Sequence, residues 1–157
     1  AYAMTYPARV QTLTVCNGAY AGGDIDHVHD WAERMETSMQ GWSESMMEQR
    51  FYRGAVAKAA WQWYADQQAQ ADPHCVLEAV RVLTSIDLST DLDRITMPTL
   101  LLHPDASPFI PISSMEALLH RLPNARLQVF AHARHGLPFS HATVCSQTLT
   151  SFLAEHA

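Results

Sequence analysis

The fold of this sequence is decided by Thr99-Leu100-Leu101-Leu102-His103, an uninterrupted apolar run between Pro98 and Pro104. A run of this kind predicts a strand that is buried on both faces, as the strands of a parallel sheet are. A second strand is predicted over Arg126-Leu127-Gln128-Val129-Phe130. Between the two strands, apolar residues at positions 115, 118, 119 and 122 mark one face of a helix. The order strand, helix, strand predicts a βαβ unit with two parallel strands.

The helix of this unit has recognisable ends. Ser113 and Glu116 have the spacing of a capping box, which predicts Ser113 as the N-cap. Pro123-Asn124 is expected to stop the helix, because proline cannot continue it.

Polar side chains follow both predicted strands. Asp105 and Ser107 come after the first strand, and His132 and His135 come after the second. The carboxyl ends of parallel strands meet at one edge of a sheet, where open α/β sheets keep their sites. We therefore expect a functional site at this edge.

Composition excludes several classes of protein. The chain has 157 residues, of which 48% are hydrophobic and 17% are charged, as in an ordinary globular domain. A net charge of −6 argues against nucleic acid or an anionic membrane as the main partner. No apolar run reaches the roughly 20 residues of a membrane span, and no signal peptide is recognisable. Three widely spaced cysteines suggest no disulfide framework, so we expect a cytoplasmic protein.

The first 94 residues divide into a short core segment and a helical block. Residues 1–7 predict the last turn of a helix, and the apolar, β-branched Arg9–Cys16 predicts a strand. Glycines at positions 41 and 54 and caps at positions 26, 43 and 72 predict four helices, at about residues 26–40, 43–53, 55–70 and 73–85. A final amphipathic helix is expected over residues 140–156. We therefore predict three parts: a core segment (1–16), a helical cap (17–94) and a C-terminal core (95–157).

This order of elements resembles the C-terminal part of an α/β-hydrolase. Leu13-Thr14-Val15-Cys16-Asn17 resembles strand six of that family, Pro98–His103 resembles strand seven, and His132-Ala133-Arg134-His135 resembles the loop after strand eight. The Cys16-Asn17 end and the cap length look most like 3-oxoadipate enol-lactonase and related hydrolases of C–O or C–C bonds. The resemblance implies an α/β fold: a partial α/β-hydrolase core of three parallel strands with flanking helices, and an inserted four-helix cap.

The resemblance also implies an activity. It implies a serine hydrolase that cleaves a small-molecule ester, lactone or related acyl bond, with no cofactor and no metal. The sequence holds no G-x-S-x-G nucleophile elbow. We therefore expect this chain to be one part of the enzyme and to be inactive by itself.

The site residues implied by the resemblance are His135 and Asp105. His135 occupies the position of the catalytic base, and Asp105 is the nearest carboxylate to the position of the acid that orients it. The acid loop of the family, G-x-x-D-x-x-x-P, places Ser107 at the acid position when it is aligned on Pro98–Pro111. Ser107 could hydrogen-bond a histidine but has no charge to stabilise its protonated form. The alternative for Asp105 is a turn or cap acceptor.

Other candidate groups favour simpler interpretations. Metal-ligating residue types cluster early in the chain, at Asp24, Asp26, His27, His29 and Asp30, but they also suit a solvated loop and a helix start, so no metal site is predicted. His103 is expected to be a packed, hydrogen-bonded histidine. The cap's Met and Trp residues suit a core, a pocket wall or both. Each of the three cysteines is expected to be a buried structural thiol.

A second class of function stays open, namely a non-enzymatic α/β-hydrolase-like binding or interaction module. Ser107 at the acid position favours this alternative, and the His135 loop favours the enzyme. In either case the predicted strand Arg9–Cys16 has a neighbour on one side only. We expect it to pair with a missing N-terminal half or with a second copy of the chain, because an open strand edge is a template for pairing.

Overall fold

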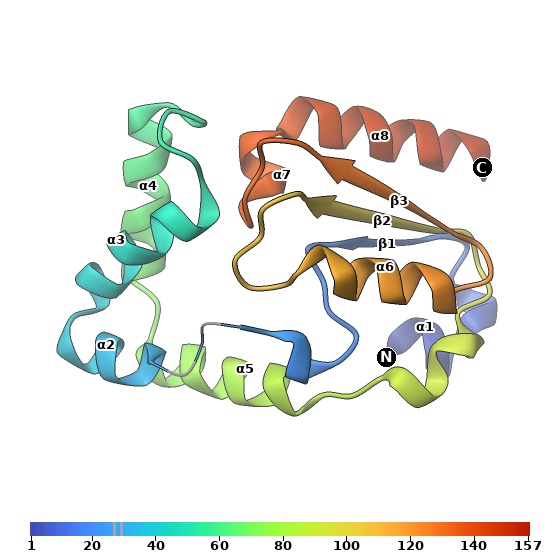
Figure 1. Ribbon diagram of the computed structural model, residues 1–157, viewed down its shortest axis with the longest axis horizontal. Coiled ribbons are helices and arrows are strands. Elements are labelled where there is room, and N and C mark those ends of the chain that lie inside the picture. Colours follow the sequence, from blue (N-terminus) through green and yellow to red (C-terminus); the bar gives the residue numbers. More distant parts are fainter. Residues whose placement is uncertain (27, 29) are drawn as a thin grey trace.

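The centre of the molecule is a three-stranded parallel sheet. The computed structural model describes residues 1–26, 28 and 30–157 (Figure 1). The strands are β1 (Leu13–Cys16), β2 (Thr99–Pro104) and β3 (Ala125–Phe130), in the spatial order β1-β2-β3. All pairs are parallel, and Val15, Leu101 and Leu127 lie side by side across the sheet. The predicted α/β class and its three parallel strands are confirmed.

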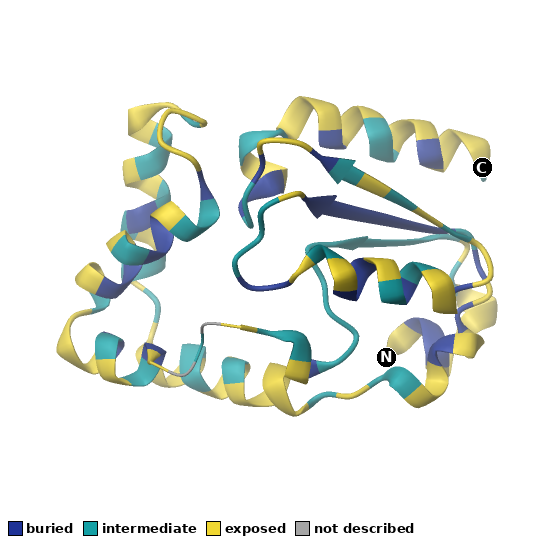
Figure 2. Ribbon diagram, viewed as in Figure 1, coloured by how far each residue is buried: buried dark blue, intermediate teal, exposed yellow. Residues whose placement is uncertain are grey.

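Strand β2 is buried at every residue, as its unbroken apolar run predicts, whereas β3 alternates between exposed and partly buried positions (Figure 2). The side chain of Leu101 packs on one face of the sheet, against α1 (Tyr2–Thr5), η3 (Ser89–Arg94) and α6 (Ile112–Arg121). Leu100 and Leu102 point to the other face and pack against α7 (Leu137–Ser140) and α8 (Ala142–Glu155). Helices therefore cover both faces of β2, which is why this strand does not alternate between buried and exposed residues.

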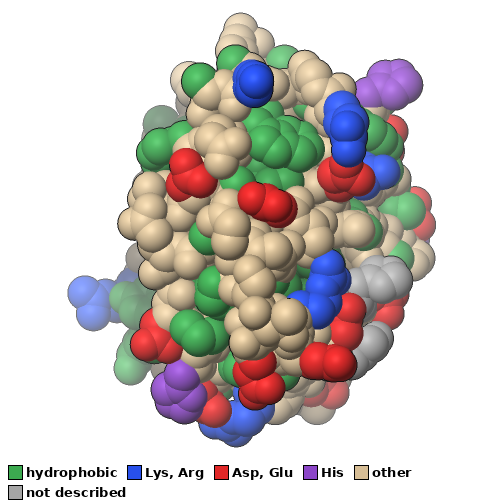
Figure 3. All heavy atoms as spheres, turned by 90° about the vertical axis from the view of Figure 1, so that its left-hand side faces the viewer, with side chains coloured by type: hydrophobic (Ala, Val, Ile, Leu, Met, Phe, Trp, Pro, Cys, Tyr) green, Lys and Arg blue, Asp and Glu red, His purple; other side chains and the backbone are tan. Residues whose placement is uncertain are grey.

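The helical cap lies between β1 and β2 in the chain and beside the sheet in space (Figure 1). It comprises η2 (Gly22–Asp24), α2 (Trp31–Thr37), α3 (Met39–Arg50), α4 (Lys58–Ala69) and α5 (Pro73–Ser85). Its own core joins Trp31, Met35, Trp42 and Met46 to Phe109 of the loop after β2. The side of the molecule that α2–α4 form carries acidic and basic side chains in mixture (Figure 3).

Local sequence signals predicted some helix boundaries of the cap domain correctly and others incorrectly. Asp72 caps α5 as predicted, since its Oδ1 accepts from the backbone N–H of His74 at 2.8 Å. The predicted helix stop at Gly41 is wrong: Ser38 caps α3 and its Oγ accepts from Gly41 N–H at 3.0 Å. Gly41 therefore lies in the first turn of α3. The cap at Ser43 is wrong for the same reason, because Ser43 is buried inside that helix.

Other boundaries also differ from the prediction. The first cap helix, α2, begins at Trp31 and not at Asp26. Arg9 belongs to η1 (Pro7–Arg9), and the strand begins only at Leu13, whose N–H donates to Pro98 O at 3.0 Å. Helix α6 begins at Ile112 after Pro111, and Ser113 makes no capping bond. The last predicted helix is confirmed as α8 but begins two residues late, because Ser140 is the last residue of α7 and α8 begins at Ala142.

The helices of the described part are all too short or too polar to cross a lipid bilayer.

Candidate active site

The candidate site lies at the carboxyl edge of the sheet, where the loops after all three strands meet. The loop after β2 carries Asp105 and Ser107, and the loop after β3 carries His132 and His135. Asn17 follows β1 directly, and its side-chain amide donates to the carbonyl oxygen of His135. The predicted meeting of polar groups at this edge therefore occurs.

Asp105 holds the backbone of the histidine loop. Its Oδ2 accepts from the N–H of His132 at 2.9 Å, and its Oδ1 accepts from the N–H of Ala133 at 3.1 Å. Burial would raise the pKa of Asp105, but these two N–H donors and the nearby His132 ring outweigh it and hold the pKa below its usual value. His132 has a φ of +56°, an uncommon backbone conformation for a non-glycine residue. The Asp105 carboxylate thus secures a tight turn in the histidine loop.

The side chain of His135 contacts Ser107. The Nδ1 atom of His135 lies 3.1 Å from Ser107 Oγ, which also accepts from the N–H of Ile110 at 3.3 Å. The ring of Phe109 meets the imidazole edge to face, with 4.9 Å between the ring centroids. The contact with this ring that was expected from Asp105 is therefore made by Ser107. Asp105 instead binds the backbone of His132 and Ala133, and Ala133 lies two residues before His135. A catalytic role for His135 or Asp105 remains a prediction.

The surroundings of His135 favour its neutral form. Burial, the positive charge of Arg50 and the nearby His103 together lower the pKa of His135 from 6.5 to about 4. A neutral imidazole has one ring nitrogen free to accept a proton. In the tautomer in which Nδ1–H donates to Ser107 Oγ, the nitrogen that can accept a proton is Nε2.

His103 has the packed role predicted for it. It is fully buried, and its Nε2 lies 3.1 Å from the carbonyl oxygen of Ile110. Burial lowers its pKa, although the bond to Ile110 opposes the shift. His103 therefore supports the loop between β2 and α6.

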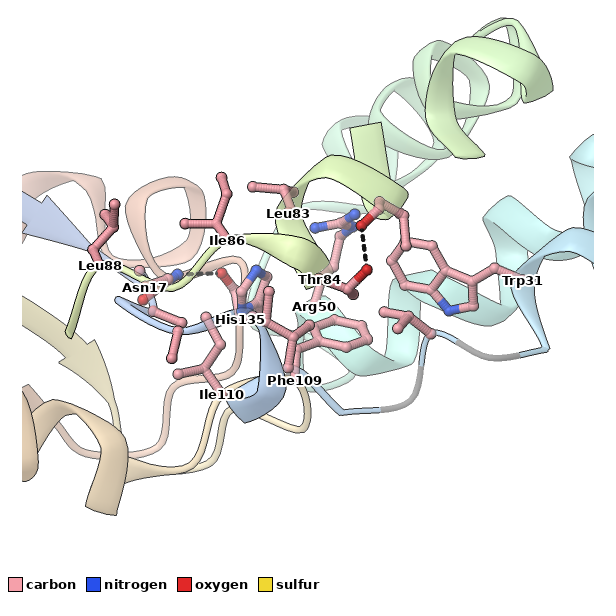
Figure 4. Close-up of a pocket in the computed structure, with 17 residues that line it drawn as sticks. Asn17, Trp31, Arg50, Leu83, Thr84, Ile86, Leu88, Phe109, Ile110 and His135 are labelled. Carbon is pink, nitrogen blue, oxygen red and sulfur yellow. Dashed lines mark hydrogen bonds between the residues drawn. The ribbon is translucent and has the colours of Figure 1, made fainter. Parts of the chain in front are cut away.

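A pocket of about 330 Å³ opens beside His135 (Figure 4). Its wall is mainly apolar and comes from the loop after β1, from α2 and α5, and from the loop after β2; it includes Val28, Trp31, Val80, Leu83, Ile86, Phe109 and Ile110. Trp31 serves both as pocket wall and as part of the cap core. The volume and the lining suit a small, largely apolar ligand.

Arg50 is the charged residue of this pocket that the sequence did not single out. It ends α3, and its Nε donates to Gln68 Oε1 at 2.8 Å. Its carbonyl oxygen accepts from the N–H of Gly136 at 2.8 Å, next to His135. Burial lowers the pKa of Arg50, and Tyr64 opposes this shift. The spacing of a cap helix gives no sign of which arginine faces a loop more than 80 positions away.

The remaining candidates are structural. Among the described residues no group of three metal-binding side chains comes together. His27 and His29 of the early cluster lie outside the described residues. Cys145 is buried as predicted, Cys16 is half-buried, and the prediction of a buried thiol is wrong for Cys75, which is exposed in α5. Burial and the neighbouring Cys145 raise the pKa of Cys16 to about 11, so its thiol is a poor nucleophile.

Comparison with known proteins supports the fold. No protein-family model matches the sequence. A non-heme haloperoxidase of Rhodococcus erythropolis is 30% identical over 92 residues, which are 58% of this chain and 33% of that protein. The chain thus spans about a third of the length of this curated relative.

Solved structures match nearly the whole chain. An esterase from Exiguobacterium antarcticum aligns with 97% of this chain and 62% of its own, with a TM-score of 0.82 and 20% identity. An α/β hydrolase from a Medee basin deep-sea metagenome aligns with 98% of this chain and 59% of its own, with a TM-score of 0.81 and 15% identity. The fold is that of an α/β-hydrolase. The chain matches about three-fifths of these structures, and at such identities the likeness establishes the fold alone.

Proposed function

We propose that this chain is the cap-and-histidine part of an α/β-fold serine hydrolase. The proposed reaction is hydrolysis of an ester, a lactone or a related acyl bond, and enol-lactones of the 3-oxoadipate type are among the candidate substrates. One observation supports this most strongly: His135 is a neutral, partly buried imidazole, held at Nδ1 by Ser107, beside an apolar pocket.

In this proposal His135 is the general base and acid. Its Nε2 takes the proton of a nucleophilic hydroxyl as that oxygen attacks the acyl carbon, and then returns it to the leaving alkoxide. The same nitrogen next takes a proton from water as the water oxygen attacks the acyl carbon, and it returns this proton to the nucleophile's oxygen when the bond to the acyl group breaks and the carboxylic acid leaves. Ser107 Oγ accepts from Nδ1–H throughout and so keeps Nε2 facing the reaction. Ser107 adds no negative charge, so the imidazolium is stabilised less than it would be by an acid.

The nucleophile is proposed to lie outside these 157 residues. A preceding segment or a separate chain would bring it to the site along the free edge of β1. Strand β1 pairs with β2, and no other strand of the described part borders it. All four of its residues are only half-buried. A strand edge of this kind pairs readily with another strand, so we propose that Leu13–Cys16 is where the rest of the enzyme attaches.

Association through this edge can be measured directly. We expect light scattering at micromolar concentration to show a dimer, or a complex with the N-terminal half when that half is present. The backbone N–H groups of β1 that face away from β2 should then be protected from hydrogen exchange. A monodisperse monomer with those groups unprotected would disprove the proposed attachment.

Activity tests the catalytic proposal. The chain by itself should not hydrolyse p-nitrophenyl acetate. The same chain joined to the segment that precedes it in its gene should do so, and His135→Ala should reduce that rate by at least about 100-fold, the usual contribution of a general base. His120→Ala, which changes an exposed histidine of α6, is the matched control. Full activity of His135→Ala would refute the assigned base.

The alternative is a binding module that has kept the hydrolase scaffold. The neutral Ser107 at the position beside His135 favours it, since a carboxylate is the group expected there in a hydrolase. A joined protein that binds acyl compounds in the pocket but never turns them over would support this alternative.

A further inference from the structure

Arg50 is a cation in an otherwise apolar pocket, without a carboxylate partner. The other pocket-lining side chains are apolar except for Asn17, Thr84 and His135 (Figure 4). Among the described residues, no Asp or Glu forms a salt bridge with Arg50, although five other arginines of the chain do have such partners. Withdrawing a charge from water is costly unless it is paired. The pocket therefore holds a positive charge that no acidic side chain compensates.

The guanidinium group of Arg50 is held in place, but only one of its nitrogens has a hydrogen-bond partner among the described residues. Nε is occupied by Gln68 Oε1, and the guanidinium carbon lies 5.6 Å from the centre of the Tyr64 ring. Neither Nη1 nor Nη2 has a hydrogen-bond partner among the described residues. Two N–H₂ groups in one plane are the geometry that receives both oxygens of a carboxylate.

The position of Arg50 relative to His135 is fixed through the backbone. The carbonyl oxygen of Arg50 accepts from Gly136 N–H at 2.8 Å, and Phe51 packs directly against Gly136. The pocket wall thus has a cation near one end of the histidine loop and mainly apolar groups elsewhere.

We propose that this pocket takes an acyl compound that also carries a carboxylate, and that Arg50 receives this carboxylate beside His135. The proposal rests on the proposed function for the acyl part and on the geometry of Arg50 for the carboxylate. An apolar wall and a single cation select a small compound with an apolar body and one acidic end. A pocket of about 330 Å³ has room for such a compound.

Occupation of Arg50 has a consequence for His135. The positive charge of Arg50 is one cause of the lowered pKa of His135, after burial and before His103. A bound carboxylate cancels that charge, so the pKa of His135 rises and the imidazole becomes a stronger base. The correct substrate would therefore activate the group that reacts with it.

Binding of pentanoate and of its neutral analogue pentanamide to the chain tests the proposal. Isothermal titration should show saturable binding of pentanoate and at least about 10-fold weaker binding of pentanamide, since a charge-assisted pair is stronger than a neutral one. Arg50→Met should weaken pentanoate about 10- to 100-fold and leave pentanamide nearly unchanged. Arg53→Met is the matched control, because Arg53 is exposed and paired with Glu48.

Two further measurements make the outcome unambiguous. Arg50→Lys keeps the charge and should retain part of the preference for pentanoate, even if Arg50→Met folds poorly. Proton NMR of the His135 ring should show an upward shift of its pKa with pentanoate and none with pentanamide. Equal binding of the two ligands, no binding of pentanoate, or an unchanged His135 pKa at saturation would each overturn the proposal.

Failure of this inference and failure of the proposed function are distinguishable. The titrations report occupancy of the pocket and need no turnover, whereas the ester assay reports turnover of a neutral acetate. Turnover without a preference for carboxylates refutes the Arg50 subsite alone. A preference for carboxylates without turnover in the joined protein refutes the hydrolase alone.

Discussion

Replacing Ser107 with aspartate should make His135 a much stronger base. In the native protein the Nδ1 atom of His135 faces a neutral hydroxyl at 3.1 Å, and the pKa of the imidazole is about 4. Ser107→Asp puts a carboxylate at the same place. The protonated imidazole then gains an ion pair that the hydroxyl cannot provide, so the pKa must rise.

The distance sets the size of the effect. Two unit charges about 3 Å apart attract by about 5 kcal/mol at an effective dielectric constant of about 20. Part of this attraction is lost because the new carboxylate must itself leave water, and because Arg50 competes for it. Carboxylates close to a cation commonly shift a pKa by about 1 to 3 units. We therefore expect the pKa of His135 in Ser107→Asp to lie roughly 1 to 3 units above the native value.

The assay is a proton NMR titration of the His135 ring between pH 3 and pH 8. Ser107→Asn is the matched control, because asparagine has nearly the shape of aspartate and no charge. It should leave the pKa near the native value. If aspartate and asparagine give the same pKa, or if aspartate lowers it, position 107 does not face the imidazole and the site geometry is wrong.

Three further predictions concern stability. A Cβ atom on Gly136 would lie 2.1 Å from Phe51 Cε1, so Gly136→Ala should cost about 1 to 3 kcal/mol and lower the Tm by several degrees. Gly23→Ala, which meets open space, should leave the Tm unchanged. Asp105→Asn should lower the free energy of unfolding in urea by about 1 to 2 kcal/mol, because an amide offers one acceptor oxygen to two N–H donors. An unchanged midpoint of urea unfolding would contradict the role of Asp105 in holding the histidine loop. Because the pKa of His135 is about 4 when folded and about 6.5 when unfolded, its contribution to stability is complete above pH 6.5 and is lost as the pH falls towards 4. The free energy of unfolding should drop by up to about 3 kcal/mol over this range, and His135→Gln should remove that part of the slope.

The fold was predictable where the signal is local or where burial is extreme. The run Thr99–His103 centres on three leucines and has no charged residue, so only a strand covered on both sides suits it, and its two polar residues are buried with it. Asp72-Pro73 fixes a helix start within two residues. Gly41 shows the limit of such signals. Glycine ends many helices, but here the free N–H groups of the first turn of α3 take Ser38 as their cap, and Gly41 is one of them. Two local signals competed, and tertiary packing of Trp42 and Met46 into the cap core favours the longer helix.

The site itself was less predictable, because it depends on how two loops lie against each other. Along the strands each residue of β2 pairs with the residue 26 positions later, up to Pro104 and Phe130. If that register continued past the strands, Ser107 would face position 133. Instead His132 adopts a left-handed conformation, and the Asp105 carboxylate accepts from the N–H groups of His132 and Ala133 in that turn. As a result Ser107 faces His135, 28 positions later. The turn thus inserts two residues into the histidine loop. The residue that gives the carboxylate to the turn is for that reason not the residue that reaches the ring. The acid-loop spacing, aligned on Pro98–Pro111, did place Ser107 at the position that faces the histidine. The register of the strands alone does not show this shift, since it results from the backbone conformation of one residue and from two hydrogen bonds between segments that the chain brings together only on folding.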